Sequence, residues 1–132
     1  MACLDTTFLI DWLRGSERAR KKYEELRGNV EGQQLSTSII TAYELEKGAK
    51  LSKNSGKDLS LVRDLLSELL ILELDMRTVD LSSELYSDLS RNGKLIGEFD
   101  ILIAAACIAN GQTLLTNDSD FNQIKKLAKL HY

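Results

Sequence analysis

The hydrophobic positions of this 132-residue chain form short apolar runs separated by longer segments of helical periodicity. Apolar runs of this length, bounded by turn-forming residues, are typical of buried strands, whereas spacings of three and four residues are typical of helices. The expected strands are residues 1–4, 33–38, 71–74 and 113–116, with an edge strand at 130–132. The expected helices are residues 7–13, 17–27, 39–51, 59–70, 80–90, 99–110 and 120–129.

Turn-forming residues mark the ends of these elements. Gly15 separates the first two helices, Gly28 ends the second, and Asp58 in the loop 54–58 is expected to cap the helix that follows. The helix 99–110 is apolar around most of its circumference, as expected of a helix packed against a sheet. Helices alternating with strands predict an α/β fold, a three-layer α/β/α sandwich around a mainly parallel sheet of four to five strands.

The composition fits a single globular domain over residues 1–132. The chain is 43% hydrophobic and 28% charged, which favours a packed core over disorder. Its longest apolar run, residues 101–109, is far shorter than the roughly 20 residues that span a bilayer. The first residues lack the basic start and apolar stretch of a signal peptide, so we expect the protein in the cytoplasm.

The sequence offers few of the residues that several classes of catalytic site require. His131 is the only histidine, which argues against Ser-His-Asp, Cys-His and zinc sites. Cys3 and Cys107 lie in apolar segments and are expected to be small buried residues. The net charge of −3 argues against binding nucleic acid through global positive charge, although a local basic groove stays open.

Acidic residues, in contrast, occupy positions where chemistry is plausible. Asp5 ends the first strand and Asp118 lies two residues past the fourth, so the two carboxylates meet if these strands are neighbours. Asp100 lies in the first turn of the most apolar helix. An acid there gains about 0.3–1 kcal/mol from the helix N-terminus, so it is either an ordinary end-of-helix acid or part of a site. Partial burial of a lone carboxylate costs several kcal/mol, which favours a site.

The two remaining acids are ambiguous taken alone. Glu44 borders the packed face of its helix but could also pair with Lys47, as Glu46 could with Lys50. Asp120 and Asp118 could shape a turn as well as hold an ion. Converging carboxylates would repel one another unless a divalent cation neutralised them, and oxygen ligands select Mg²⁺ or Mn²⁺. Metal-assisted phosphodiester hydrolysis is the chemistry that this set could best perform.

The acidic segments, in this order, resemble the signature motifs of PIN-domain ribonucleases, in particular of VapC-type toxins. The motifs read LDTTFLIDWLRG (4–15), TAYELEKGA (41–49), GEFDILIAAACIANG (97–111) and LLTNDSDF (114–121). The resemblance implies a PIN-like fold and a catalytic, metal-binding quartet. Its members are Asp5, Glu44, Asp100 and Asp118. Asp120 ranks behind Asp118 as a supporting ligand, Thr7 and Thr116 are expected to orient carboxylates or water, and Glu98 is expected either at the rim of the site or as a solvated loop acid.

The resemblance also implies a substrate and partners. The family cleaves RNA, often in loops of transfer or ribosomal RNA, and Arg14, Lys47 and Lys50 are the basic residues expected to contact it. It further implies a homodimer and a VapB-type antitoxin that assembles with the toxin into a heterotetramer or larger complex. Helices 7–27 and 39–51 are the candidate surfaces for the antitoxin.

Two alternatives remain at this point. One is a housekeeping PIN-domain nuclease for RNA processing, with the same chemistry and no antitoxin; a neighbouring antitoxin reading frame would separate the two. The other is a non-enzymatic receiver-like module with an acidic pocket. That module needs adjacent acids after the first strand, where LDTT offers one, and an acceptor acid after the third, where Asp75 could serve.

Overall fold

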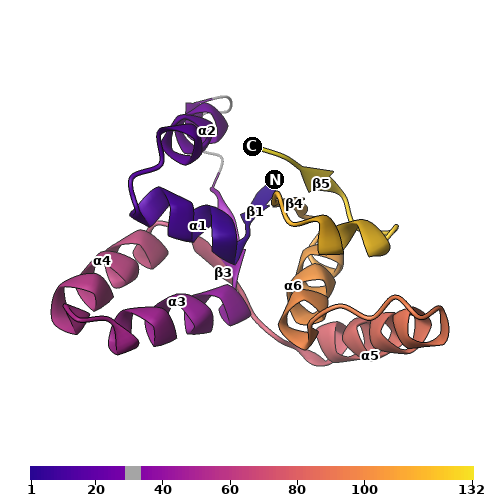
Figure 1. The fold of residues 1–132 in the computed structure, drawn as a ribbon. Helices are drawn as coiled ribbons and strands as arrows, with labels where there is room; N and C mark the ends of the chain where they lie inside the picture. The colour runs from indigo at the N-terminus through magenta and orange to yellow at the C-terminus, as the bar shows by residue number, and fades with distance from the viewer. Residues whose placement is uncertain (29–33) are drawn as a thin grey trace.

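A parallel five-stranded sheet forms the centre of the fold in the computed structural model, which describes residues 1–28 and 34–132 (Figure 1). The strands lie in the order β3-β2-β1-β4-β5, and every described neighbouring pair is parallel. Their bounds are β1 Ala2–Leu4, β2 Ser36–Ser38, β3 Leu70–Leu72, β4 Thr113–Leu115 and β5 Lys129–Leu130. The predicted α/β fold is confirmed; residue 33 of the expected second strand lies outside the described residues.

Helices cover both faces of the sheet. Their bounds are α1 Thr6–Leu13, α2 Glu17–Gly28, α3 Ile39–Leu51, α4 Ser55–Ser67, α5 Met76–Arg91 and α6 Glu98–Ala109, with a 3-10 helix, η1, at Ser119–Gln123. Helices α1 to α4 lie to one side of the sheet, while α5, α6 and η1 lie to the other (Figure 1). None of the helices in the described part of the chain is long and apolar enough to cross a membrane.

The alternation of side chains along β1 divides the core in two. Cys3 packs with the α5 and α6 residues, whereas Leu4 packs with the helices of the opposite layer. In β4, Leu114 and Leu115 divide in the same way. Side chains of a strand alternate between faces, so β1, which is buried on both sides, is apolar throughout. Cys3 and Cys107 are both buried and free, as expected.

The order of the strands reverses between β1 and β4. The chain first builds β2 and β3 on one side of β1 and then returns to place β4 and β5 on the other. Leu4 of β1 pairs with Leu115 of β4, so both strands end at the same level. The crevice beyond the carboxyl ends at such a reversal is where α/β sheets bind ligands. Asp5 and Asp118 are expected to lie close together if the strands that precede them are neighbours, and β1 and β4 are neighbours.

Helices α4 and α5 begin about one turn earlier than the sequence pattern predicts. Helix α4 begins at Ser55, so Asp58 lies in its first turn and Asn54 holds the cap position instead. Helix α5 begins at Met76 rather than at residue 80, because Asp75 caps it: the Asp75 carboxylate accepts hydrogen bonds from the Thr78 N–H and hydroxyl, both at 2.9 Å. Such a cap satisfies a backbone N–H that has no partner within the first turn, and so favours a helix that begins at Met76.

The predicted helix 120–129 is wrong. Only the 3-10 turn at Ser119–Gln123 forms, and Ile124 and Leu127 then insert into the core beside α5 and α6. After the turn the chain runs into β5. The Ala128 carbonyl, just before this strand, accepts the Leu114 N–H at 2.9 Å. Sheet pairing satisfies these backbone groups, so the helical preference of the segment is overridden.

Candidate metal centre

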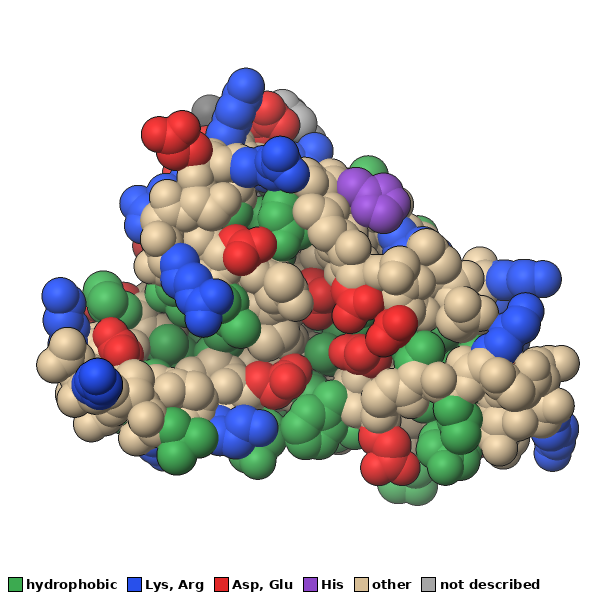
Figure 2. Space-filling view, in the orientation of Figure 1, with side chains coloured by type: hydrophobic (Ala, Val, Ile, Leu, Met, Phe, Trp, Pro, Cys, Tyr) green, Lys and Arg blue, Asp and Glu red, His purple; other side chains and the backbone are tan. Residues whose placement is uncertain are grey.

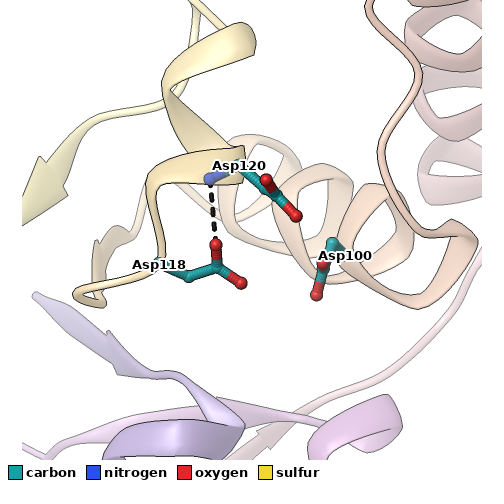
Figure 3. A group of neighbouring side chains, drawn as sticks. All are labelled: Asp100, Asp118 and Asp120. Atoms are coloured by element: carbon teal, nitrogen blue, oxygen red, sulfur yellow. Dashed lines mark hydrogen bonds between the residues drawn. The ribbon is translucent and has the colours of Figure 1, made fainter.

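Acidic side chains collect at the carboxyl edge of the sheet, where one face of the molecule carries a group of red side chains near its middle (Figure 2). Three of these acids point toward one another (Figure 3). They are Asp100 of α6, Asp118, which precedes η1, and Asp120 of η1. One carboxylate oxygen from each lies within 4.8 Å of the others. Two segments, the first turn of α6 and the turn at the start of η1, thus bring these carboxylates together.

Asp5 lies beside this group and is almost fully buried, with 3% of its surface exposed. Its Oδ1 accepts the Thr6 N–H at 2.8 Å, which makes Asp5 the N-cap of α1. Its Oδ2 accepts the Thr116 hydroxyl at 2.7 Å. These two donors fix the carboxylate on the boundary between β1 and β4 and compensate part of the cost of burying it.

A chain of hydrogen bonds continues from Asp5 into the last motif. The Thr116 hydroxyl that donates to Asp5 also accepts the Asp118 N–H at 3.0 Å. Asp118 Oδ1 in turn accepts the Asp120 N–H at 2.9 Å and caps η1. The turn therefore shapes the segment and also brings the carboxylates of Asp118 and Asp120 close to Asp100.

Glu44 of α3 is held by a hydrogen bond from α1. Thr6 donates its hydroxyl to Glu44 Oε1 at 2.9 Å, and its oxygen lies 3.0 Å from the Thr41 hydroxyl. Thr41 is buried in the first turn of α3, where its N–H donates to the Ser38 cap at 3.0 Å. Helix α1 thus fixes both Asp5 and Glu44.

The mutual repulsion of these acids changes their ionisation. Burial, followed by the charges of Asp5, Asp118, Glu44 and Asp120, raises the pKa of Asp100 from its ordinary value of 3.8 to about 6. Burial also raises the pKa of Asp5 against the opposing effect of the Thr116 and Thr6 hydrogen bonds, and Asp118 and Glu44 raise it further. Five carboxylates therefore share one electrostatic environment with too much negative charge.

This donor set fits a hard divalent cation. The ligand group contains carboxylate oxygens alone in the described residues, with no sulfur or imidazole among them. Such oxygens suit Mg²⁺, Mn²⁺ or Ca²⁺ rather than zinc or copper. A cation would also neutralise the charge that raises the pKa of Asp100.

Of the three basic residues expected to contact RNA, Arg14 and Lys47 lie beside residues that flank the acidic site. Arg14, at the end of α1, lines a groove of about 320 Å³ between α1, α3 and α4 that reaches Glu44. Lys47 is exposed on α3, with its ammonium 5.2 Å from the centre of the Tyr43 ring and 5.9 Å from that of Phe99. Lys50 is exposed one turn further along α3.

The structure also places three other candidate residues, Thr7, Glu98 and Asp75. Thr7 is exposed, and in the first motif it is Thr6 whose hydroxyl bonds a site carboxylate, that of Glu44. Glu98 is exposed and lines a hollow with Val79 and Tyr86 of α5. The carboxylate of Asp75 caps α5, which accounts for this acid without an acceptor role.

Sequence reasoning missed Thr6 and its partner Thr41. The available signal was the cap itself: the residue after an N-cap begins the helix, so its side chain projects from the first turn beside the capping carboxylate.

Comparison with known proteins agrees with this geometry. Residues 2–127 match the model of the PIN domain family. The chain is 34% identical over 116 residues to ribonuclease VapC2 of Haemophilus influenzae, which covers 87% of this chain and 84% of that protein. It is 24% identical over 116 residues to the tRNA(fMet)-specific endonuclease VapC of Shigella flexneri, over 88% and 85% of the two chains. The crystal structure of VapBC2 from Rickettsia felis bound to a DNA fragment from their promoter superposes with a TM-score of 0.90 at 27% identity, covering 99% of this chain and 98% of that one.

Proposed function

Because this chain belongs to the PIN-domain family, among the VapC-type ribonucleases, we propose that it hydrolyses phosphodiester bonds in RNA as the toxin of a type II toxin–antitoxin pair. The observation that carries the proposal is the group of carboxylate oxygens of Asp100, Asp118 and Asp120 within 4.8 Å of one another. The group lies at the reversal of strand order, with Asp5 and Glu44 next to it.

Asp100, Asp118 and Asp120 would hold the cation, with Asp5 and Glu44 completing its surroundings. We favour Mg²⁺ or Mn²⁺, because these ions are bound by few carboxylates and retain water for reaction. When bound, such an ion lowers the pKa of its water and neutralises charge on the phosphate under attack.

The residues of the chain position the reactants. Thr6 fixes Glu44 Oε1, and we assign Glu44 to orienting the attacking water from the α3 side. Thr116 fixes Asp5, so that the negative charge at the floor of the site stays in place. Preorganised charges of this kind avoid reorganisation during the reaction.

The proposed RNA lies over the acidic site and along its basic rim. Arg14, Lys47 and Lys50 are assigned to phosphate contacts, which fix the register of the RNA without reading its sequence. A relative is named a tRNA(fMet)-specific endonuclease. We therefore favour a tRNA or rRNA loop, where exposed bases can be read. We accordingly propose that the protein acts in the cytoplasm.

The proposed partner is a VapB-type antitoxin, since a similar structure is named a VapBC complex. The groove beside Glu44 is lined by apolar side chains such as Ile10, Leu45 and Leu61, and Arg14 and Glu44 also line it. An amphipathic segment fits this groove with its apolar face inward. A basic side chain at its end would then reach the acids. We expect a toxin homodimer that forms a heterotetramer or larger complex with the antitoxin.

Cleavage of total RNA by the purified protein tests the proposal. The protein is freed of copurified antitoxin and incubated in Mg²⁺ or in Mn²⁺, with EDTA and Asp100→Asn as controls. Discrete fragments that vanish in both controls are expected. Cleavage that survives Asp100→Asn would contradict the assignment of the site.

A further inference from the structure

The residue Tyr132 is joined to the last acidic motif through its backbone. Its N–H donates to Asn117 Oδ1 at 3.0 Å, and its main-chain oxygen accepts from Asn117 Nδ2 at 2.7 Å. The side-chain amide of Asn117 is therefore bound at both ends by one residue that lies 15 positions away. This two-point pairing fixes the orientation of Asn117 although its side chain is exposed.

The side chain of Tyr132 is anchored on α1. Its hydroxyl donates to Asp11 Oδ2 at 2.7 Å. Its ring meets the fully buried Phe8 ring edge to face, with the ring centres 4.8 Å apart. Such an aromatic pair contributes beyond the area that it buries. Tyr132 thus connects Asn117 to the same helix that Asp5 caps.

These contacts give the segment that carries Asp118 a second connection to α1, besides the bond between Thr116 and Asp5. Asn117 stands between Thr116, which donates to Asp5, and Asp118, whose oxygens face Asp100 and Asp120. One path from α1 to this segment runs through Asp5 and Thr116, and the second runs through Tyr132 and Asn117. A segment held at two points has fewer accessible conformations than one held at a single point.

We propose that Asn117 and Tyr132 form a clamp, the Asn117–Tyr132 clamp, that positions Asp118 for metal binding. Both are positioning residues, since they act through Thr116 and Asp118. The clamp as such rests on geometry alone; its effect on the metal rests on the proposed function.

Two readouts separate these parts. Amide hydrogen exchange at Asp118 and Asp120 in EDTA measures the opening of the segment without metal, because both N–H groups are bonded within it. Binding of Mn²⁺, followed by electron paramagnetic resonance, measures the ligand geometry. Partners that orient metal ligands typically change metal affinity by about 10- to 100-fold.

Asn117→Ala removes both bonds to Tyr132, and Tyr132→Phe removes the Asp11 bond while keeping the ring on Phe8. We expect exchange at Asp118 and Asp120 to accelerate about tenfold in Asn117→Ala and several-fold in Tyr132→Phe, with Mn²⁺ affinity falling in the same order.

Matched controls exist elsewhere in the chain. Asn92→Ala removes a side-chain amide bond to the Asp88 carbonyl of equal length, 2.7 Å, at the end of α5. Tyr23→Phe removes a tyrosine bond to a carboxylate, Glu68, at 3.1 Å. Neither control should change exchange at Asp118.

Unchanged exchange in Asn117→Ala would overturn the clamp. Faster exchange with unchanged Mn²⁺ affinity would overturn its role in metal binding. A third outcome is that exchange is faster in Asn117→Ala although the wild-type protein binds no Mn²⁺. This outcome would support the clamp and count against the proposed function.

Discussion

Thr116 donates its hydroxyl to Asp5 at 2.7 Å across 111 positions of sequence, and the same oxygen accepts the Asp118 N–H at 3.0 Å. Thr116 is 1% exposed, so water cannot readily replace it as a partner. Thr116→Val should leave the Asp118 N–H without its acceptor and Asp5 with one donor fewer. We expect a loss of about 1–3 kcal/mol in the free energy of unfolding, measured by urea denaturation. Thr116→Ser keeps the hydroxyl and should retain most of the stability; equal losses in both variants would contradict the prediction.

Thr6 and Thr7 offer a matched pair of neighbouring substitutions. Thr6→Val removes the hydroxyl that donates to Glu44, whereas Thr7→Val changes an exposed side chain. We expect RNA cleavage to fall about tenfold or more in Thr6→Val and to stay near wild type in Thr7→Val. The reverse order would assign the orienting role to Thr7 and contradict the geometry.

Asp118 and Asp120 should differ as metal ligands. Asp118 is half-buried and also orders η1 through the Asp120 N–H, whereas Asp120 is exposed. Titration of Mn²⁺ into Asp118→Asn should therefore show a loss of affinity about tenfold larger than in Asp120→Asn. Ser119→Ala, between them, serves as a control. A larger loss in Asp120→Asn would reverse the ranking.

The stability of the metal-free protein should fall as the pH rises through the window set by Asp100. In the unfolded chain this carboxyl ionises near its ordinary pKa of 3.8, whereas its pKa in the folded protein is about 6. Between these values the unfolded state binds fewer protons than the folded state, so the free energy of unfolding decreases with pH. The raised pKa of Asp5 acts in the same direction.

Urea denaturation in EDTA at several pH values between 4 and 7 measures this slope. Asp100→Asn removes the titrating group and should flatten the curve relative to wild type. Saturating Mn²⁺ should restore stability most at the upper end of the window, because binding to the folded state adds to the free energy of unfolding. A slope that is identical in Asp100→Asn and wild type would contradict the prediction.

Arg14 should contribute to RNA binding through charge. Arg14→Ala, measured with Asp100→Asn as a non-cleaving background, should weaken binding and reduce the slope of log affinity against log salt by up to about 1. Arg91→Ala is the control. It removes the same charge at the end of α5, where Arg91 Nη1 lies 3.6 Å from Asp88 Oδ1. Equal effects of both substitutions would indicate non-specific attraction.

Sequence reasoning predicts the parts of the site that backbone topology determines. Asp5 and Asp118 follow two strands of a parallel sheet, and the carboxyl ends of such strands meet at one edge once the strands are neighbours. Asp100 was identifiable because an acid in the first turn of a very apolar helix needs a compensating partner.

Contacts that depend on side-chain direction could not be predicted. Thr6 rather than Thr7 meets Glu44 because α1 begins directly after the Asp5 cap, and a shift of one residue turns a helical side chain by about 100°. The grouping of Asp120 with Asp118 depends on the short η1 turn. The hydrophobic periodicity of residues 120–129 predicts a longer helix there, which would not give this grouping. The pairing of Asn117 with Tyr132 joins two segments that carry no common pattern.

The placement of β4 beside β1 also governs when the site can exist during synthesis. The floor of the site needs Asp5 from the start of the chain and residues 116–120 from a segment translated more than a hundred residues later. A ribosome must release β4 before it can pair with β1, and pairings this distant in sequence are the slowest to form. A partly translated chain therefore carries Asp5, Glu44 and even Asp100 without an assembled site, and under the proposed assignment the nascent protein stays inactive until its last acidic segment has emerged.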